Sequence, residues 1–369
     1  MKVPFLDLGA AVAEIRPELD EAWHRVMDRG WFVAGAELEA FESEFAAFTE
    51  ADACVGVANG LDALSLVLRA WEIGPGDEVI VPGHTFIATW LAVSYVGATP
   101  VPVEVDAATC NLDPAAIEAA ISPRTRAIIP VHLYGQLADM QTIGGIAQRH
   151  GLKVLEDAAQ AHGARRDGRS AGAFGDAVAW SFYPGKNLGA YGDGGAVTTR
   201  DVALARRLRA LRSYGSERKY VHDLAGVNSR LDELQAALLR VRLRHLAAWN
   251  ERRRGIAAHY QAALAGLPGL TLPHVADASE PVWHLYVVRH AERDRLQAAL
   301  AEHGVQTLMH YPTPPHHCGA YAATHGDVSL PISEGIAATV LSLPIGPQQT
   351  ETQTSAVVAA VRNVIHAAG

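Results

Sequence analysis

Cysteine is scarce in this sequence, with three residues in 369. Cys54, Cys110 and Cys318 lie far apart, so they form neither a paired disulfide framework nor the close spacing of a zinc site. A long apolar run is also missing at the start of the chain, where residues 1–7 lack the hydrophobic stretch of a signal peptide. We therefore expect a cytoplasmic protein that folds without disulfides.

The sequence also lacks an excess of positive charge. Its 31 Lys and Arg residues stand against 40 Asp and Glu residues, which gives a formal net charge of −9 at pH 7. We therefore expect no binding to nucleic acid or to a membrane surface, although a local basic pocket for one diphosphate remains compatible with this charge. With 49% hydrophobic residues, the chain can bury a sizeable core in one large and one smaller domain.

Two common nucleotide-binding motifs are absent. The glycine-rich stretch around Lys186 is not a P-loop, because Trp180 and Asn187 stand where that motif needs a glycine and a hydroxyl residue. Residues 192–195 lack the spacing of a dinucleotide fingerprint and precede a strand-like segment rather than a helix. This second stretch is expected to form a tight turn back into a sheet.

The pattern that is present is an alternation of strand-like runs with helical stretches of about ten residues or more, which is typical of a mainly parallel sheet with crossover helices. The runs lie at 54–57, 78–81, 100–103, 127–131, 153–156, 178–182 and 196–199. Two opening helices are expected around residues 8–29 and 37–49, and a long one at about 231–264. We predict a large α/β domain at 1–250 and a smaller α+β domain at 251–369.

The residues with the clearest chemical meaning are Lys186 and Asp157. Lys186 lies in a turn bounded by Gly and Pro after a strand-like run, where it is expected to be held away from solvent. Asp157 ends a buried strand and is followed by Gln160. Pyridoxal phosphate needs an amine for a Schiff base and a carboxylate that keeps its pyridine nitrogen protonated. The pair therefore suggests a pyridoxal phosphate site.

Other segments could complete this site. Gly60 and Leu61 open an apolar helix after a short strand, where free amides and the helix dipole suit a phosphate. Ser181 adds a hydroxyl five positions before Lys186. Phe86 could stack on the pyridine ring and is favoured over Trp90 for this role. Farther along the chain, residues 227–233 look like a loop followed by a helix start, where Ser229 could cap the helix and the Asn228 amide could bind a ligand.

Taken together, these segments resemble the nucleotide-sugar aminotransferases, the DegT-type branch of the fold type I pyridoxal phosphate enzymes. The resemblance covers essentially the whole chain. It rests on residues 3–8, 59–60, 156–163, 181–189 and 226–230. It implies an aspartate-aminotransferase-like fold, with a mixed, mostly parallel seven-stranded sheet in the large domain and a smaller C-terminal domain.

The resemblance also implies roles for individual residues. Lys186 would hold the cofactor covalently and move protons, Asp157 would face the pyridine nitrogen, and Gln160 would contact the ring hydroxyl. The phosphate would be held by Gly60, Leu61 and Ser181, with Asn228 reaching in from the other subunit of a homodimer. The reaction would be a ping-pong transamination from L-glutamate to a nucleotide-linked ketosugar. Some relatives carry histidine in place of the lysine and dehydrate, which Lys186 disfavours here.

Segments 85–93, 216–220 and 310–316 look most like the enzymes that aminate C-3 of dTDP-linked 3-keto-6-deoxyhexoses. On that resemblance Tyr183, His310 and Tyr311 would line the sugar site, and Lys219 of the partner subunit would help to bind the diphosphate. A C-4 or other nucleotide-sugar aminotransferase, and a regulatory paralogue that binds the cofactor without turnover, are the alternatives.

A metal site is the competing interpretation of one histidine-rich segment. His310, His316, His317 and Cys318 are residues of the types that bind zinc. Because adjacent histidines in a proline-rich loop rarely converge on one ion, we expect no metal there.

Overall fold

The large domain is built on a seven-stranded sheet. The computed structural model describes residues 1–368, and the strand order is β1-β9-β8-β5-β4-β2-β3. Strand β9 runs opposite to the other six strands, which all run in the same direction. The seven strands are β1 (Ala53–Val57), β2 (Glu78–Pro82), β3 (Thr99–Val103), β4 (Thr125–Ile128), β5 (Lys153–Asp157), β8 (Ala177–Ser181) and β9 (Gly195–Thr199). The sequence-predicted mixed, mostly parallel sheet is confirmed.

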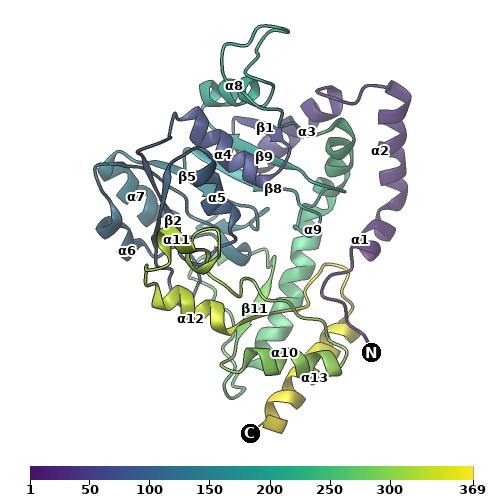
Figure 1. The fold of residues 1–369 in the computed structure, drawn as a ribbon. Coiled ribbons are helices and arrows are strands. Elements are labelled where there is room, and N and C mark those ends of the chain that lie inside the picture. The colour runs from purple at the N-terminus through teal and green to yellow at the C-terminus, as the bar shows by residue number, and fades with distance from the viewer. Residues whose placement is uncertain (369) are drawn as a thin grey trace.

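Helices cover both faces of this sheet (Figure 1). Along β8, Val178 and Trp180 pack in one core cluster with helices α3 and α9, while Ala177 and Ala179 belong to the opposite cluster with α4 and α5. The helices of this domain are α1 (Leu8–Glu14), α2 (Arg16–Arg29), α3 (Ala36–Phe48), α4 (Gly60–Ala70), α5 (Ala88–Tyr95), α6 (Pro114–Ile117), α7 (Met140–His150), α8 (Val202–Leu211) and the start of α9 (Glu233–Leu264).

The prediction of one helix over residues 8–29 is wrong, because this segment forms two helices. The structure divides residues 8–29 into α1 and α2, with Ile15 between them. Pro17 stands in the first turn of α2, where a proline is tolerated. Inside one continuous helix the same proline would lack the N–H for a backbone hydrogen bond, and its ring would clash with the carbonyl group four residues earlier. The chain therefore opens with three helices rather than two before β1.

The C-terminal part forms a second core at the lower end of the molecule in Figure 1. Its two-stranded antiparallel sheet packs with helices and with the second half of α9. These elements are β11 (Tyr286–Arg289), α10 (Arg293–Glu302), β12 (Val340–Leu343) and α13 (Glu351–Ala368). Helix α12 (Pro331–Thr339) precedes β12, and its Ile336 packs instead in a cluster with Leu133 and Leu285. The boundary expected at residue 250 falls inside α9, which runs without interruption from the first core into the second.

Short elements complete the chain. They are η1 (Glu118–Ala120), η2 (Leu133–Gly135), β6 (Arg165–Arg166), β7 (Arg169–Ser170), β10 (Ser279–Glu280), η3 (Pro315–His317) and α11 (Ala322–His325). The loop between α8 and α9 projects away from the body of the molecule (Figure 1), and Tyr220 in this loop is 83% exposed. Within residues 1–368, no helix has the length and apolar character that crossing a membrane requires.

Candidate active site

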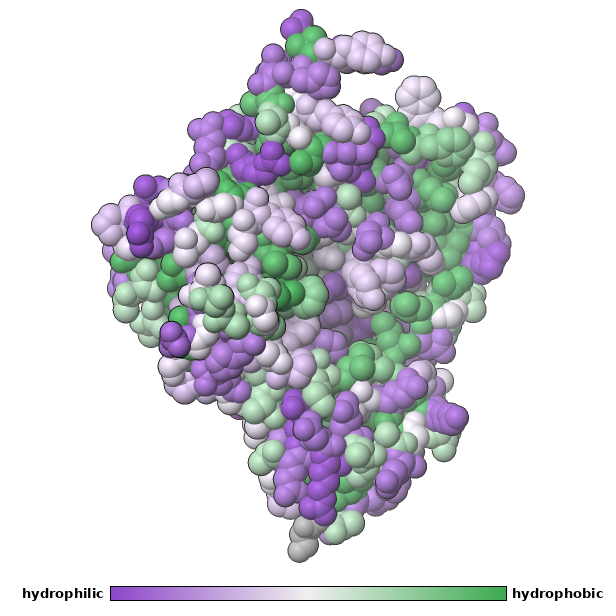
Figure 2. All heavy atoms as spheres, viewed as in Figure 1, coloured by the Kyte–Doolittle hydropathy of each residue, from purple (hydrophilic) through white to green (hydrophobic). Residues whose placement is uncertain are grey.

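A large cavity lies where the carboxyl ends of β5 and β8 meet the start of α4 and the C-terminal core. Its volume is about 840 Å³. The space-filling view shows a hollow near the middle of one face, with hydrophobic side chains on both sides (Figure 2). Ten of the twelve sequence-predicted site residues line the cavity: Gly60, Leu61, Phe86, Asp157, Gln160, Ser181, Tyr183, Lys186, His310 and Tyr311.

Lys186 lies in the turn that follows β8. The amide N–H of Lys186 donates to the carbonyl oxygen of Tyr183 at 2.8 Å, which closes the turn and directs the side chain into the cavity. Burial lowers the pKa of the Lys186 amine to about 8, against the opposing attraction of the Asp157 carboxylate. The amine is therefore a better nucleophile near neutral pH than an ordinary lysine.

This lowered pKa leads to a pH prediction. When pyridoxal phosphate is added to cofactor-free protein, the rate of covalent attachment should rise with pH through a midpoint near 8, because only the unprotonated amine reacts. Borohydride trapping at a series of pH values, followed by mass spectrometry, measures this rate. A midpoint near the value of about 10.4 for free lysine would contradict the burial of the amine.

Asp157 ends β5 with its carboxylate in the cavity. Oδ1 accepts the N–H of Ala159 at 3.2 Å, and Oδ2 accepts the hydroxyl of Thr89 at 3.0 Å. Burial raises the pKa of the Asp157 carboxyl, while these two hydrogen bonds and the charge of Lys186 act in the opposite direction. The carboxylate is thus oriented by these two hydrogen bonds, and no cation among residues 1–368 forms an ion pair with it, which suits a protonated ring nitrogen as its partner.

The start of α4 forms a cradle of backbone amides beside Ser181. Asn59 caps the helix by accepting the N–H of Asp62 at 2.8 Å. Among the described residues, the amide N–H groups of Gly60 and Leu61 have no hydrogen-bond acceptor, and the Ser181 hydroxyl lies beside them. Free amides at a helix N-terminus bind anions, so the cradle fits the phosphate of pyridoxal phosphate.

Gly60 is required by this close approach. A Cβ atom at position 60 would lie 2.6 Å from the Cβ of Ser181, so Gly60→Ala should displace the helix start from Ser181. We expect the dissociation constant for pyridoxal phosphate to rise about tenfold or more, from the cost of overpacking. Equilibrium titration followed by cofactor absorbance measures this change.

Gly255→Ala is the matched control for this substitution. Gly255 lies inside α9 with open space around its Cα, so alanine there should leave cofactor affinity unchanged and raise stability by about 0.5–1 kcal/mol. Equal cofactor affinity in Gly60→Ala and in the unmodified protein would contradict the phosphate cradle.

Gln160 is held in the cavity by two neighbours. Its Oε1 accepts the N–H of Tyr134 at 2.6 Å, and its Nε2 donates to the hydroxyl of Tyr311 at 3.1 Å. The Tyr134 hydroxyl donates to the carbonyl oxygen of His310, so one tyrosine fixes both the amide and the His310 segment. Tyr134 has a φ of 61°, a left-handed backbone that no local pattern in the sequence indicates.

Aromatic side chains form part of the cavity wall. Phe86 is 52% exposed and its ring centroid lies 5.3 Å from that of Tyr311, which leaves a flat face open to the cavity. Phe86 precedes α5 by two residues rather than starting that helix. Trp90 is fully buried and donates its indole N–H to the carbonyl oxygen of Pro82, so the preference for Phe86 is consistent with the geometry.

Lys219 and Asn228 lie outside the cavity of their own chain, in the projecting loop between α8 and α9. Asn228 is exposed. Ser229 does not cap α9 as expected, because that helix begins at Glu233 with Asp232 at its N-cap position. Instead the buried Ser229 hydroxyl donates to Asp62 Oδ2 at 2.6 Å and ties the loop to α4.

The expectation that the adjacent residues His316 and His317 do not converge on one point is wrong. Donor atoms of His316 and His317 converge with a carboxylate oxygen of Glu334, all within 4.8 Å of one another. His310 is not part of this group and instead bonds through Nδ1 to the Ser342 hydroxyl at 2.8 Å. Glu334 lies on α12, far along the chain from the pair, so spacing alone could not reveal the grouping.

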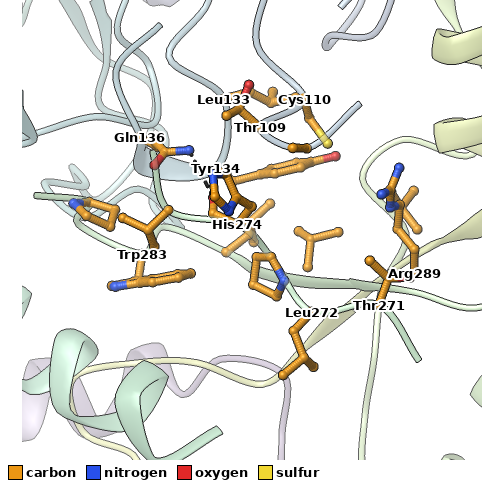
Figure 3. Close-up of a pocket in the computed structure, with 17 residues that line it drawn as sticks. Thr109, Cys110, Leu133, Tyr134, Gln136, Thr271, Leu272, His274, Trp283 and Arg289 are labelled. Carbon is orange, nitrogen blue, oxygen red and sulfur yellow. Dashed lines mark hydrogen bonds between the residues drawn. The ribbon is translucent and has the colours of Figure 1, made fainter. Parts of the chain in front are cut away.

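A second, much smaller cavity of about 40 Å³ lies next to the larger one (Figure 3). Leu133 and Leu285 line both cavities and separate them. Tyr134, Cys110 and Arg289 point toward its interior in the close-up. None of the twelve sequence-predicted site residues lines it.

Comparison with known families gives a match over nearly the whole chain. The model of the DegT/DnrJ/EryC1/StrS aminotransferase family matches residues 13–362. The chain is 58% identical over 362 residues to the dTDP-3-amino-3,4,6-trideoxy-alpha-D-glucose transaminase of Streptomyces venezuelae, covering 98% of this chain and 96% of that protein. It is 53% identical to the dTDP-3-amino-3,6-dideoxy-alpha-D-galactopyranose transaminase of Aneurinibacillus thermoaerophilus, with coverage of 97% and 98%.

The fold has an equally similar relative among solved structures. The crystal structure of S. venezuelae DesV in complex with a ketimine intermediate superimposes with a TM-score of 0.97 at 57% sequence identity. The match covers 99% of this chain and 98% of that chain. The architecture is therefore that of the fold type I aminotransferases.

Proposed function

Because this chain belongs to the DegT/DnrJ/EryC1/StrS aminotransferase family and is a pyridoxal phosphate-dependent nucleotide-sugar transaminase, we propose that it aminates C-3 of a dTDP-linked 3-keto-6-deoxyhexose. The proposed amino donor is L-glutamate. The observation that carries the proposal is the convergence of Lys186, Asp157 and the phosphate cradle of α4 in one cavity. The names of two close relatives, both of 3-amino sugar transaminases, support position 3 and the dTDP carrier.

The residues in the cavity fit pyridoxal phosphate at its phosphate, its ring nitrogen and its aldehyde. Gly60, Leu61 and Ser181 would hold the phosphate, Asp157 the ring nitrogen, and Lys186 the aldehyde carbon. When bound, the cofactor withdraws electrons from the carbon that carries the amino group and so makes the proton on that carbon acidic.

Lys186 is the residue that moves this proton. Once the donor has displaced its amine, the free Nζ would take the proton from the α carbon of glutamate and deliver it to the cofactor side. Water would then cleave the carbon–nitrogen bond, so that 2-oxoglutarate leaves and the amino group stays with the cofactor. In the second half the same nitrogen moves a proton in the reverse sense, to C-3 of the sugar. A pKa of about 8 lets the amine both accept and return a proton near neutral pH.

The histidines near this amine are themselves uncharged at physiological pH. Burial together with the charge of Lys186 lowers the pKa of His162 to about 3 and that of His310 to about 4. His284 is shifted well below its ordinary pKa for the same first reason, burial. These rings are therefore neutral at physiological pH, and His310 can offer a hydrogen bond to a sugar hydroxyl without competing for the proton.

The functional unit is proposed to be a homodimer with shared active sites. Asn228 and Lys219 are exposed on the projecting loop and do not reach the cavity of their own chain. A loop that extends beyond its own domain can reach a second copy related by twofold symmetry. In that copy Asn228 would contact the cofactor phosphate, and Lys219 would contact the diphosphate of the sugar nucleotide.

Mixing two inactive variants tests this sharing. Lys186→Ala and Asn228→Ala should each be nearly inactive alone, but a mixed dimer contains one site with both native residues. Random re-association of equal amounts should restore about a quarter of the native sites, since half of the dimers are mixed and each has one intact site. Activity that stays at the level of the separate variants would place Asn228 outside the partner's site.

The proposed reaction itself is tested with purified protein, pyridoxal phosphate and L-glutamate. Glutamate should bleach the cofactor absorbance, and dTDP-3-keto-6-deoxyglucose or its galacto epimer should restore it. Mass spectrometry and NMR of the product should place the new amine at C-3. An amine at C-4, or bleaching without recovery by either sugar, would reject the C-3 assignment, and no response to glutamate would reject that donor.

A further inference from the structure

Three side chains of metal-binding types meet between η3 and α12. A ring nitrogen of His316, a ring nitrogen of His317 and a carboxylate oxygen of Glu334 all lie within 4.8 Å of one another. Among residues 1–368, no other three His, Cys, Asp or Glu side chains converge in this way. None of the three lines the active-site cavity, so the group is separate from the proposed reaction.

The local backbone brings the three side chains together. His316 and His317 are consecutive residues of the short helix η3, and their ring centroids lie 4.1 Å apart with 54° between the ring planes. Glu334 reaches the pair from the first turn of α12, where its Oε1 also accepts the N–H of Leu330 at 2.8 Å. The carboxylate is therefore held in place by its own helix, whether or not a cation is bound.

The separation of His316 and Glu334 suits a shared metal ion. Nε2 of His316 lies 3.3 Å from Oε1 of Glu334, which is long for an N–H···O hydrogen bond, since these centre on about 2.9–3.0 Å. Two ligand atoms that are each about 2.0–2.1 Å from a tetrahedral zinc ion lie roughly 3.3–3.4 Å apart. The two side chains therefore stand at the separation of neighbouring zinc ligands.

The imidazole of His316 is buried without a full set of partners. The residue is 0% exposed, and its Nδ1 has no hydrogen-bond partner among residues 1–368. With the proton on Nε2, the lone pair of Nδ1 lacks a donor. With the proton on Nδ1, that N–H lacks an acceptor and the lone pair of Nε2 faces the carboxylate of Glu334. A cation between Nε2 and Glu334 would attract both the lone pair and the carboxylate.

We propose that His316, His317 and Glu334 bind one Zn²⁺ ion, with water in the fourth position. Two imidazoles and one carboxylate are typical zinc ligands, whereas Mg²⁺ and Ca²⁺ prefer oxygen ligands alone. Cys318 follows the pair in the chain but is not the fourth ligand, because its thiol is directed to the carbonyl oxygen of Pro314 at 3.6 Å and lies outside the group.

The ion would clamp η3 to α12. Helix η3 begins four residues after Tyr311, which lines the active-site cavity, and α12 leads directly into β12. Prolines at positions 312, 314 and 315 restrict the backbone between Tyr311 and the histidine pair. Fixing η3 therefore restrains this wall of the cavity, and the ion stabilises the fold rather than taking part in the reaction.

Calorimetric titration of chelator-treated protein with ZnCl₂ tests the site. The native protein should bind one Zn²⁺ per chain and no Mg²⁺. His317→Ala should weaken Zn²⁺ binding by roughly 100-fold, since even groups that only support a metal ligand commonly contribute 10- to 100-fold to affinity. His317 is exposed, so this variant is expected to fold. His303→Ala is the matched control, because His303 is an exposed histidine at the end of α10, and it should bind Zn²⁺ as the native protein does.

Glu334→Gln tests the carboxylate separately. Glutamine keeps an oxygen that can accept the N–H of Leu330, so the start of α12 should remain intact, but it lacks the negative charge. Its affinity for Zn²⁺ should fall by a factor similar to that of His317→Ala. Absence of saturable Zn²⁺ binding by the native protein, or native affinity in both variants, would overturn the inference. Loss of binding in Cys318→Ser would overturn the assignment of the three ligands.

Two measurements need no substitution at the site. Zn²⁺ at a hundred times its Kd should raise the Tm of the native protein by about 3–5 °C, because the ion binds the folded chain. Anomalous diffraction at the zinc edge should place the ion between His316, His317 and Glu334. An unchanged Tm, or an ion bound only at other residues, would contradict the proposal. Zinc binding does not depend on the reaction, so failure of the C-3 assignment would leave these results standing.

Discussion

Replacing Lys186 with alanine should abolish covalent attachment of pyridoxal phosphate and lower kcat by about 10⁴-fold or more, since one amine both holds the cofactor and moves the proton. The sequence contains only four lysines, at positions 2, 153, 186 and 219. Borohydride reduction and peptide mass spectrometry can therefore assign the attachment to one of them without ambiguity. The phosphate cradle is untouched by the change, so non-covalent binding should persist.

Lys153→Ala provides the matched control. Lys153 is an exposed lysine that pairs with Asp176 at 3.0 Å; it begins β5, at the opposite end of that strand from Asp157, and does not line the cavity. Its removal should change neither attachment nor turnover beyond the small effect of losing a surface ion pair. If borohydride reduction of the native protein fixed the cofactor on a lysine other than Lys186, the assignment of Lys186 as the attachment site would be wrong.

Asp157→Asn should produce the second-largest loss. The amide keeps the size of the carboxylate but cannot balance a positive charge on the ring nitrogen, so the cofactor loses its strength as an electron sink. Removing one partner of such a buried ion pair costs about 3–5 kcal/mol, which corresponds to a decrease in kcat of about 10²–10⁴-fold. Single-turnover measurements with glutamate isolate this step from sugar binding.

The control for Asp157→Asn is Asp193→Asn, which changes another carboxylate that lines the cavity but is exposed. Its single-turnover rate should stay close to that of the native protein. If the rate for Asp157→Asn matched that of the control, Asp157 would be an ordinary strand-end residue and the ring nitrogen would need another partner.

The sequence predicted the parts of the site that follow from local patterns. Strand ends and turn residues brought Asp157, Ser181 and Lys186 to one edge of the sheet, and the helix start at Gly60 followed from a strand-to-helix turn. These features depend on neighbours within a few positions in the chain. Parallel strands then placed their carboxyl ends together, so the cavity follows from the order of the elements.

The groups that support these residues were not predictable in the same way. Thr89 contacts Asp157 across 68 positions in the chain, and Tyr134 contacts both Gln160 and the distant His310 segment. Arg253, which also lines the cavity, lies among several arginines of α9, and only the packing of the C-terminal core buries it rather than its neighbours. Long-range packing decides such contacts, and no spacing within one segment carries that information.

The uninterrupted course of α9 limits how the cavity can move. With 32 residues the helix is about 48 Å long, and its two halves are packed into different cores. Rotating one core toward the other would bend this helix and break backbone hydrogen bonds, so hinge closure around each substrate is disfavoured. Entry and release should therefore depend on side-chain and loop motions of nanoseconds to microseconds, rather than on slower domain opening. An amino acid and a much larger sugar nucleotide would then be accepted in turn by a cleft of constant width.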